Sequence, residues 1–175
     1  LRDGIPQNDP FGGWVYWNRL PLAGIERVEV QRGGGAGAWG NAALGGTIQI
    51  FSPQISGNKL FLEASGGSQG TVDATMNVQR SFNNADVFFT AHTFRTDGYP
   101  VLREDQRGSI DENAFSETEL FEGGVRVRLD SKKTFTLRAS YFEEERGNGT
   151  PLTGNGTKGY NANASLSHTS ESGEA

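Results

Sequence analysis

From about Lys59 to the end of the chain, apolar and polar residues alternate with a period of two. Successive side chains of a β-strand point to opposite faces, so this period predicts strands with one apolar and one polar face. The clearest runs are Thr71 to Gln79, Thr134 to Tyr141 and Tyr160 to Ser167. Weaker or shorter runs cover residues 60–65, 87–94 and 125–129. The pattern therefore predicts an all-β meander of about six strands.

The connections between these runs differ in length in an ordered way. Residues 83–86 and 130–133 form tight polar turns, whereas residues 96–118 and 143–156 form long polar segments. A compact soluble domain rarely holds a structureless loop of about 20 residues, but outer-membrane barrels alternate short turns with long loops. The polar face is expected to consist of small uncharged residues, as suits a wet lumen. On the strand pattern alone, a membrane barrel and a soluble all-β domain with one solvated face both stay open.

Composition excludes several other classes of protein. The chain has 16 basic and 21 acidic residues, a net charge of −5, which argues against a nucleic-acid partner. It contains no cysteine, so it has neither a disulfide framework nor a thiolate metal site. Mean hydropathy is −0.54, and no apolar run approaches the ~20 residues of a membrane helix, but alternating barrel strands keep this average low. Both ends look cut, so we expect part of a longer protein.

No arrangement of residues predicts catalysis. His92 and His168 are the only histidines, and neither lies near a second metal-ligating or catalytic motif. We expect no catalytic residue, no metal site and no cofactor. Glycines at 35–40 match the spacing of a dinucleotide-binding loop, but a strand follows within about two helical turns, so we reject nucleotide binding.

The first 53 residues have a different texture, because they are rich in glycine and contain only two short strand-like runs. Their ordered features are Asp3-Gly4-Ile5-Pro6, Leu20-Pro21-Leu22, Ile25-Glu26-Arg27-Val28-Glu29-Val30, Arg32-Gly33, Gly40, Ala43, Gly45-Gly46 and Ile48-x-Ile50. In residue type, order and spacing, this segment resembles the end of the plug domain of TonB-dependent outer-membrane receptors. The resemblance covers about 50 residues, and the rest of the chain matches only in strand pattern.

The resemblance implies a fold and an organisation. We expect a fragment of a transmembrane β-barrel (all-β) preceded by part of a small α+β plug domain. Residues 1–53 would be the C-terminal part of the plug, and residues 54–175 the first strands, about six of about 22. The protein would lie in the bacterial outer membrane, in contact with its lipid.

The resemblance also implies a function, which is active transport of a scarce ligand such as a ferric siderophore, cobalamin or an oligosaccharide. The energy would come from the TonB–ExbB–ExbD complex through a segment outside this chain. The alternative is a soluble or surface β-rich binding module, lectin-like or adhesin, without transport. The sequence does not reveal which ligand is bound.

Three groups of residues are candidates for the site. A loop broken by Gly and Pro, which the resemblance places at the apex of the plug, offers Asn8, Asp9, Phe11, Trp14, Tyr16 and Trp17 for ligand contact. One of the two tryptophans is expected in the core of the plug instead. Charged contacts between plug and barrel wall are expected from Arg27, Glu29 and Arg32, with a solvated sheet edge as the alternative. Close backbone approach is expected at Gly33, Gly40, Gly45 and Gly46.

Overall fold

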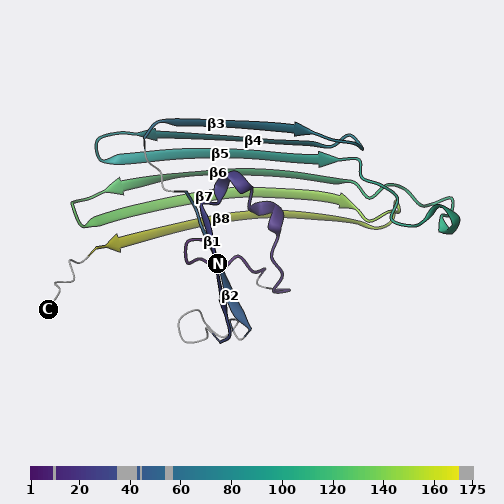
Figure 1. Cartoon of the computed structure of the whole chain (residues 1–175), viewed down its shortest axis with the longest axis horizontal. Coiled ribbons are helices and arrows are strands. Elements are labelled where there is room, and N and C mark those ends of the chain that lie inside the picture. Colours follow the sequence, from purple (N-terminus) through teal and green to yellow (C-terminus); the bar gives the residue numbers. More distant parts are fainter. Residues whose placement is uncertain (10, 35–42, 44, 54–56, 170–175) are drawn as a thin grey trace. The chain divides into compact units, whose positions relative to one another are not determined.

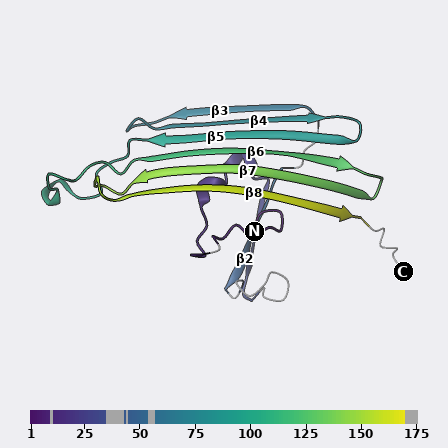
Figure 2. The same cartoon turned by 180° about the vertical axis from the view of Figure 1, so that it is seen from behind.

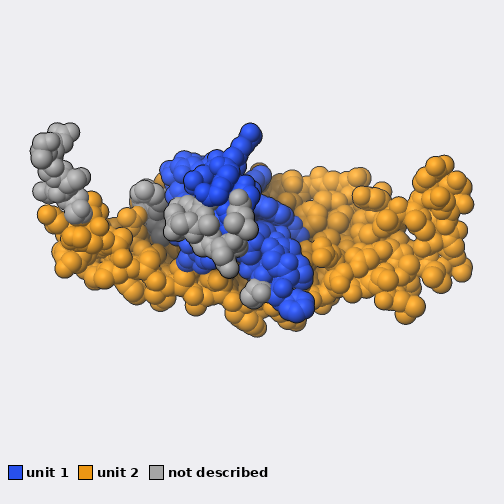
Figure 3. Space-filling model, turned by 90° about the horizontal axis from the view of Figure 1, so that it is seen from below, with its two compact units in different colours: residues 1–54 blue, residues 55–175 orange. Residues whose placement is uncertain are grey.

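The computed structural model describes residues 1–9, 11–34, 43, 45–53 and 57–169. The chain forms two compact units, Leu1–Gln54 and Ile55–Ala175 (Figure 3). Both are built on antiparallel β-strands, and the helices of the described residues are short 3-10 turns. None of these helices is long and apolar enough to cross a membrane. The glycine-rich loop at 35–40, including Gly40, lies outside the described residues.

The first unit contains a two-stranded sheet in which β1 (Arg27–Arg32) pairs with β2 (Gly46–Phe51). The N-terminal residues run alongside β2, because the N–H of Ile50 donates to the carbonyl of Leu1 and the N–H of Asp3 donates to the carbonyl of Ile50, both at 2.9 Å. Two 3-10 helices, η1 (Trp17–Arg19) and η2 (Leu22–Gly24), precede β1. Among the described residues of this unit, the buried apolar ones are Leu20, Pro21, Ala43 and Ile50.

The second unit is a six-stranded antiparallel meander in the order β3-β4-β5-β6-β7-β8 (Figures 1 and 2). Its elements are β3 (Lys59–Gly66), β4 (Val72–Ser81), β5 (Ala85–Thr96), η3 (Glu104–Gln106), β6 (Ser116–Arg128), β7 (Lys133–Gly147) and β8 (Gly154–His168). Each of the six runs of alternation falls on one of these strands, apart from the end residues Thr71 and Leu129, and each strand is longer than its run.

The expectation of a long loop at residues 143–156 is wrong. Strand β7 continues to Gly147 and β8 begins at Gly154, so the connection covers only residues 148–153. Residues on both faces are polar there, for example at Glu143 and Glu144, so alternation of apolar and polar residues cannot reveal the strand.

Direct cross-strand partners share a face of the sheet, so the register divides the side chains into two sets. The apolar face carries Leu60, Leu62, Met76, Val78, Phe89, Phe121, Phe135, Leu137, Tyr141, Tyr160 and Leu166, together with smaller residues between them. The polar face carries Thr75, Gln79, Asp86, Thr90, Thr118, Glu122, Arg138 and Glu144, with Phe88, Leu120 and Phe142 among them.

Burial is reversed relative to a soluble domain. Most large residues of the apolar face are exposed, from 37% at Val78 to 81% at Tyr160, and Met76, Phe135 and Tyr141 are half-buried. On the polar face, Thr118 and Glu122 are 1% and 6% exposed. A water-soluble sheet buries its apolar face instead. Strands that are apolar outside and polar inside are typical of outer-membrane barrels.

The polar face corrects one expectation, because it is not made only of small uncharged residues. Arg138 and Glu122 form an ion pair at 3.4 Å whose side chains are 15% and 6% exposed. The guanidinium of Arg138 also lies 5.0 Å from the centre of the Phe88 ring. Ion pairing and ring stacking lower the cost of burying these charges, which an isolated arginine would not tolerate.

Side chains also hold the tight turns at one end of the sheet. Arg128 at the end of β6 donates hydrogen bonds to the buried carboxylate of Asp86 and, at 3.1 and 3.2 Å, to the carbonyls of Phe82 and Asn83 in the β4–β5 turn. In the β6–β7 turn, backbone N–H groups of the two following lysines donate to Asp130, which lowers the pKa of that carboxyl group.

Candidate ligand-contacting loop and the faces of the sheet

The predicted ligand loop is a compact hairpin closed by its own hydrogen bonds. Asn8 pairs with Val15 in an antiparallel bridge, and the side-chain amide of Asn8 donates to the carbonyl of Gly13 at 2.8 Å. The carboxylate of Asp9 accepts from the N–H groups of Phe11 and Gly12, both at 2.9 Å. Asn8 and Asp9 therefore shape the loop, since Asx side chains stabilise such turns.

Three aromatic side chains of this segment are exposed rather than buried. Phe11 is 97% exposed, and Trp14 and Trp17 are 50% and 58% exposed, so neither tryptophan belongs to a core formed by the described residues. Trp14 meets Tyr16 edge to face with ring centres 6.2 Å apart, and the guanidinium of Arg19 lies 4.7 Å from the Tyr16 ring centre. Trp14, Tyr16 and Arg19 therefore contact one another in sequence along the loop.

The charged residues proposed for plug–barrel contacts lie on or beside the β1–β2 sheet. Arg27 pairs with Glu29 on the same strand at 2.7 Å, and the two side chains are 55% and 57% exposed. Arg27 also lies over the ring of Phe51 at 3.9 Å. Arg32 ends β1 and is exposed. Their contact with a barrel wall stays a prediction.

Two of the motif glycines have a conformational reason to be glycine. Gly33 follows β1 with φ +86, and Gly46 begins β2 with φ +141. A Cβ at Gly46 would lie 2.5 Å from the carbonyl oxygen of Gln31, so the tight β1–β2 pairing excludes any side chain there. Gly45 accepts from the N–H of Gly33 at 3.3 Å and leaves open space for a side chain.

The polar face carries a chain of side-chain hydrogen bonds across β4 and β5. Asn77 donates to Thr90 at 2.7 Å, and Gln79 donates to Asn77 at 3.2 Å. His92 lies 3.0 Å from the hydroxyl of Thr75 through its Nδ1. The network links these side chains to one another, while Oε1 of Gln79 and the hydroxyl of Thr118 on the same face are buried without a hydrogen-bond partner among the described residues.

The longest connection of the second unit, residues 97–115 between β5 and β6, is tied to both neighbouring connections. The N–H of Asp97 donates to Gln69 at 2.8 Å, and the N–H of Glu112 donates to Gly149 at 2.9 Å. Gly149 has φ +96 and a Cβ there would touch Val101 at 3.2 Å. Backbone bonds between the three loops at this end make them one structural group.

The apolar face ends toward these loops in a row of aromatic rings. Tyr141 stacks on Phe121 with centres 6.4 Å apart and lies 5.1 Å from the ring centre of Tyr160. The next row toward the loops is charged, with Lys158 and Glu143 paired at 2.6 Å. An aromatic row between an apolar band and charged residues is typical of the membrane interface.

No group of three or more His, Cys, Asp or Glu side chains that could hold a metal ion occurs among the residues that the structure describes. Sequence reasoning missed Phe121 in the aromatic row, because residues 119–124 show too short an alternation to be recognised as strand.

Comparison with known proteins defines the class. Residues 1–47 match the TonB-dependent Receptor Plug Domain. The chain is 31% identical over 150 residues to the vitamin B12 transporter BtuB of Vibrio vulnificus, covering 83% of this chain and 21% of that protein. BtuB of Photobacterium profundum is 38% identical over 59 residues, or 33% of this chain and 10% of that protein. The chain thus spans about a fifth of the length of the first relative.

A solved structure shares the fold. FpvA of P. aeruginosa, determined with bound heterologous pyoverdines, matches with a TM-score of 0.71 at 18% identity, over 98% of this chain and 25% of that chain. The fold and the faces of the sheet define an outer-membrane barrel protein that carries a plug segment. The chain belongs to the TonB-dependent receptors, as its plug motif predicts. The expected β-rich fold class and outer-membrane location are confirmed.

Proposed function

We propose that the protein containing this chain transports a scarce ligand actively across the outer membrane. The observation that carries this proposal is the direct succession of a plug-domain match at residues 1–47 and a sheet with an exposed apolar face and a buried polar face. We assign residues 1–53 to the end of the plug and residues 54–175 to the first strands of the barrel. A plug is needed only where a barrel must stay closed to small solutes and open for one ligand.

The ligand is held by aromatic residues in this proposal. Phe11 and Trp14 present large exposed rings on a hairpin fixed by Asn8 and Asp9, and the exposed ring of Trp17 follows at the start of η1. Rigid aromatic side chains bind large ligands with a small loss of conformational entropy. Release of the ligand into the periplasm requires displacement of the plug. The TonB–ExbB–ExbD complex drives this conformational change, and no covalent bond is made or broken.

Cobalamin is the first ligand to test, because the two curated relatives are named vitamin B12 transporters. Ferric siderophores and oligosaccharides follow as the other two classes. The gene is deleted, and uptake of radiolabelled cobalamin, ferric siderophores and oligosaccharides is measured in whole cells with and without a functional TonB.

We expect that deletion of the gene abolishes the uptake of one ligand, and that removal of TonB causes an equal loss of uptake. The energy-independent binding of that ligand to the cell surface should persist without TonB. Binding without accumulation in cells that have TonB would instead identify a surface binding module and contradict transport.

A further inference from the structure

The end of the β3–β8 sheet that carries the tight turns is basic. We call this end the short-turn edge and define it as residues 57–60, 80–87, 125–134 and 166–169, on the left in Figure 1. It contains two carboxylates and six cations, namely Asp86, Asp130, Lys59, Arg80, Arg126, Arg128, Lys132 and Lys133. With His168 neutral, its net charge is therefore +4.

Ion pairs within the sheet use both carboxylates of this edge. Arg128 pairs with Asp86, and Lys133 pairs with Asp130 at 3.7 Å. Arg80 forms no ion pair, side-chain hydrogen bond or ring contact with any residue that the structure describes, and its side chain is exposed. The positive charge of Arg80 is therefore available to a partner outside the sheet.

Arg80 lies on the apolar face, among apolar residues. Val78 precedes it by two positions on this face, and its cross-strand partner is Val87. Phe82 follows at the start of the turn and is 58% exposed. A charged side chain on the lipid face of a barrel is costly in the hydrocarbon and is tolerated where it reaches the headgroups. An exposed arginine in this setting therefore calls for an anionic headgroup group near it.

The position of Arg80 along its strand agrees with a headgroup contact. Arg80 is the second-last residue of β4 (Val72–Ser81), and the tight β4–β5 turn follows. In outer-membrane barrels, short turns face the periplasm, so this edge meets the inner leaflet.

A second exposed cation adds to the field beside Arg80. Lys59 is the first residue of β3, and its cross-strand partner Gln79 is the chain neighbour of Arg80. Lys59 likewise has no ion pair or side-chain hydrogen bond within the described part of the chain. It begins on the polar face, so it raises the local positive potential without taking part in the lipid contact itself.

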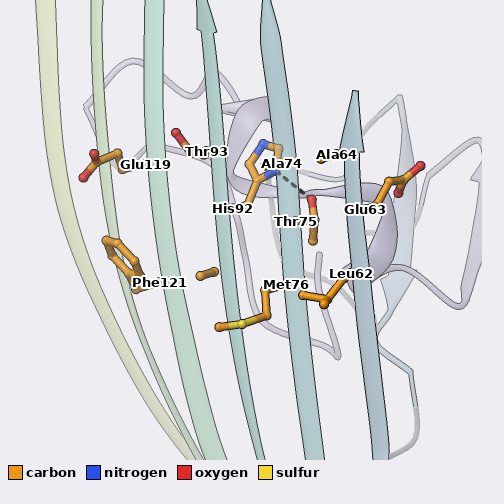
Figure 4. Close-up of a pocket in the computed structure, with 11 residues that line it drawn as sticks. Leu62, Glu63, Ala64, Ala74, Thr75, Met76, His92, Thr93, Glu119 and Phe121 are labelled. Atoms are coloured by element: carbon orange, nitrogen blue, oxygen red, sulfur yellow. Dashed lines mark hydrogen bonds between the residues drawn. The ribbon is translucent and has the colours of Figure 1, made fainter. Parts of the chain in front are cut away.

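The opposite end of the apolar face has the reverse charge. Its last two rows carry four glutamates and two cations, namely Glu117, Glu119, Glu143, Glu145, Arg95 and Lys158. Figure 4 shows Glu119 beyond the ring of Phe121 on this side of the sheet. Arg95 pairs with Glu117, and Lys158 pairs with Glu143, so an excess of two carboxylates is left at this end. An anionic headgroup is therefore attracted to the short-turn edge and repelled at the other end.

We propose that the short-turn edge binds an anionic phospholipid of the phosphatidylglycerol type, with the guanidinium of Arg80 at its phosphate. The acyl chains lie against Val78 and Val87, and Phe82 flanks the headgroup. Groups of four or more Lys and Arg at a membrane surface attract anionic lipids in this way. A zwitterionic head carries its own cation and gains less. An acidic protein partner would require the exposed cation to face water, whereas Arg80 is on the lipid-facing side.

The test uses the full-length protein in lipid nanodiscs made of phosphatidylethanolamine and phosphatidylglycerol, in which both leaflets have the same composition. In separate samples, one of the two lipids carries a photoactivatable diazirine on its acyl chain, and labelled peptides are mapped by mass spectrometry. The quantity measured is the ratio of phosphatidylglycerol to phosphatidylethanolamine labelling. We expect this ratio to be about threefold higher at residues 78–87 than at residues 117–121, since one interfacial cation changes anionic-lipid occupancy by up to about fivefold.

Substitutions connect the labelling to Arg80. Arg80→Gln should reduce the difference between the two ends to less than about 1.5-fold, whereas Arg80→Lys keeps the charge and should retain at least about a twofold difference. Arg95→Gln removes an arginine from the other end of the same face, on the neighbouring strand. It should leave the labelling ratio at residues 78–87 unchanged.

Each variant is first checked for a folded barrel by its heat-dependent gel migration. Salt gives a second measurement that needs no variant, because raising sodium chloride from about 0.05 to about 0.5 M screens exposed charges and should at least halve the enrichment. Equal labelling ratios at the two ends, or an enrichment that survives both Arg80→Gln and high salt, would overturn the proposal. The readout is lipid contact, so it does not depend on the transported ligand.

Discussion

Gly123 and Gly124 are neighbours on β6 that point to opposite faces of the sheet. A Cβ at Gly124 would collide with the ring of Phe88 and lie 2.7 Å from the carbonyl oxygen of Leu137. A Cβ at Gly123 would meet only ordinary contacts at 3.6 Å or more. Gly124 thus provides the space in which Phe88 lies beneath the guanidinium of Arg138.

Gly124→Ala should lower the free energy of unfolding by about 1–3 kcal/mol, the usual cost of overpacking a filled site. The adjacent Gly123→Ala should change it by less than about 0.5 kcal/mol. Urea titration of the full-length protein folded into lipid vesicles measures both. Equal effects of the two substitutions would show that the crowding at Phe88 does not limit the packing of the polar face.

At the scale of the strand, each β-strand presents one face to lipid and the other to a polar lumen. In β8, Ala164 faces Leu137 on the apolar side, and the next residue, Ser165, faces Thr136 on the polar side. Both side chains are small and exposed in this chain. They are neighbours on the same strand, similar in size and nearly equal in depth, so they form a pair of positions that chiefly differ in the face presented.

Ala164→Arg should destabilise the folded protein in lipid by about 2–4 kcal/mol, because it places a cation against hydrocarbon near the middle of the apolar band. Ser165→Arg should cost less than about 1 kcal/mol, since its side chain enters a wet, polar lumen. Folding efficiency and urea unfolding in vesicles compare the two. A larger penalty at Ser165 would mean that the two faces are assigned the wrong way round.

At the scale of the whole molecule, the two units have different tasks in the proposed transport cycle. In that proposal, the first unit presents exposed aromatic residues on the hairpin and in η1 for ligand contact, and the second unit forms part of the membrane wall. Leu22, also in the first unit, is 85% exposed but lies outside the hairpin. It is therefore a suitable comparison for the ligand-contacting residues.

Phe11→Ala and Trp17→Ala should each weaken ligand binding about tenfold, which corresponds to about 1.4 kcal/mol, the typical effect of removing an aromatic anchor. Leu22→Ala should leave the affinity within about twofold, since it removes no ring from the hairpin. Equilibrium binding of radiolabelled cobalamin to purified full-length protein is the measurement, with the ligand replaced by whichever class the uptake assay identifies. Loss of affinity only in Leu22→Ala would remove the hairpin from the site.

The sequence by itself determined the strands, their two faces and the plug motif. Alternation is a local property, because the geometry of one strand sends successive side chains to opposite sides. The six runs therefore pointed to six strands, and the charged and glycine-rich motif around Arg27 and Gly46 identified the family. The same local test failed where both faces are polar, as at Glu143 and Glu144, and the strands were judged too short.

Only the tertiary structure decided which side chains meet. The pairing of Glu122 with Arg138 and the place of Gly124 under Phe88 both depend on the register between strands. Partners across the sheet lie up to tens of residues apart in the chain, and no local period encodes them. A shift of one residue in any strand would send every partner to the other face, so these contacts exist only once the whole sheet has formed.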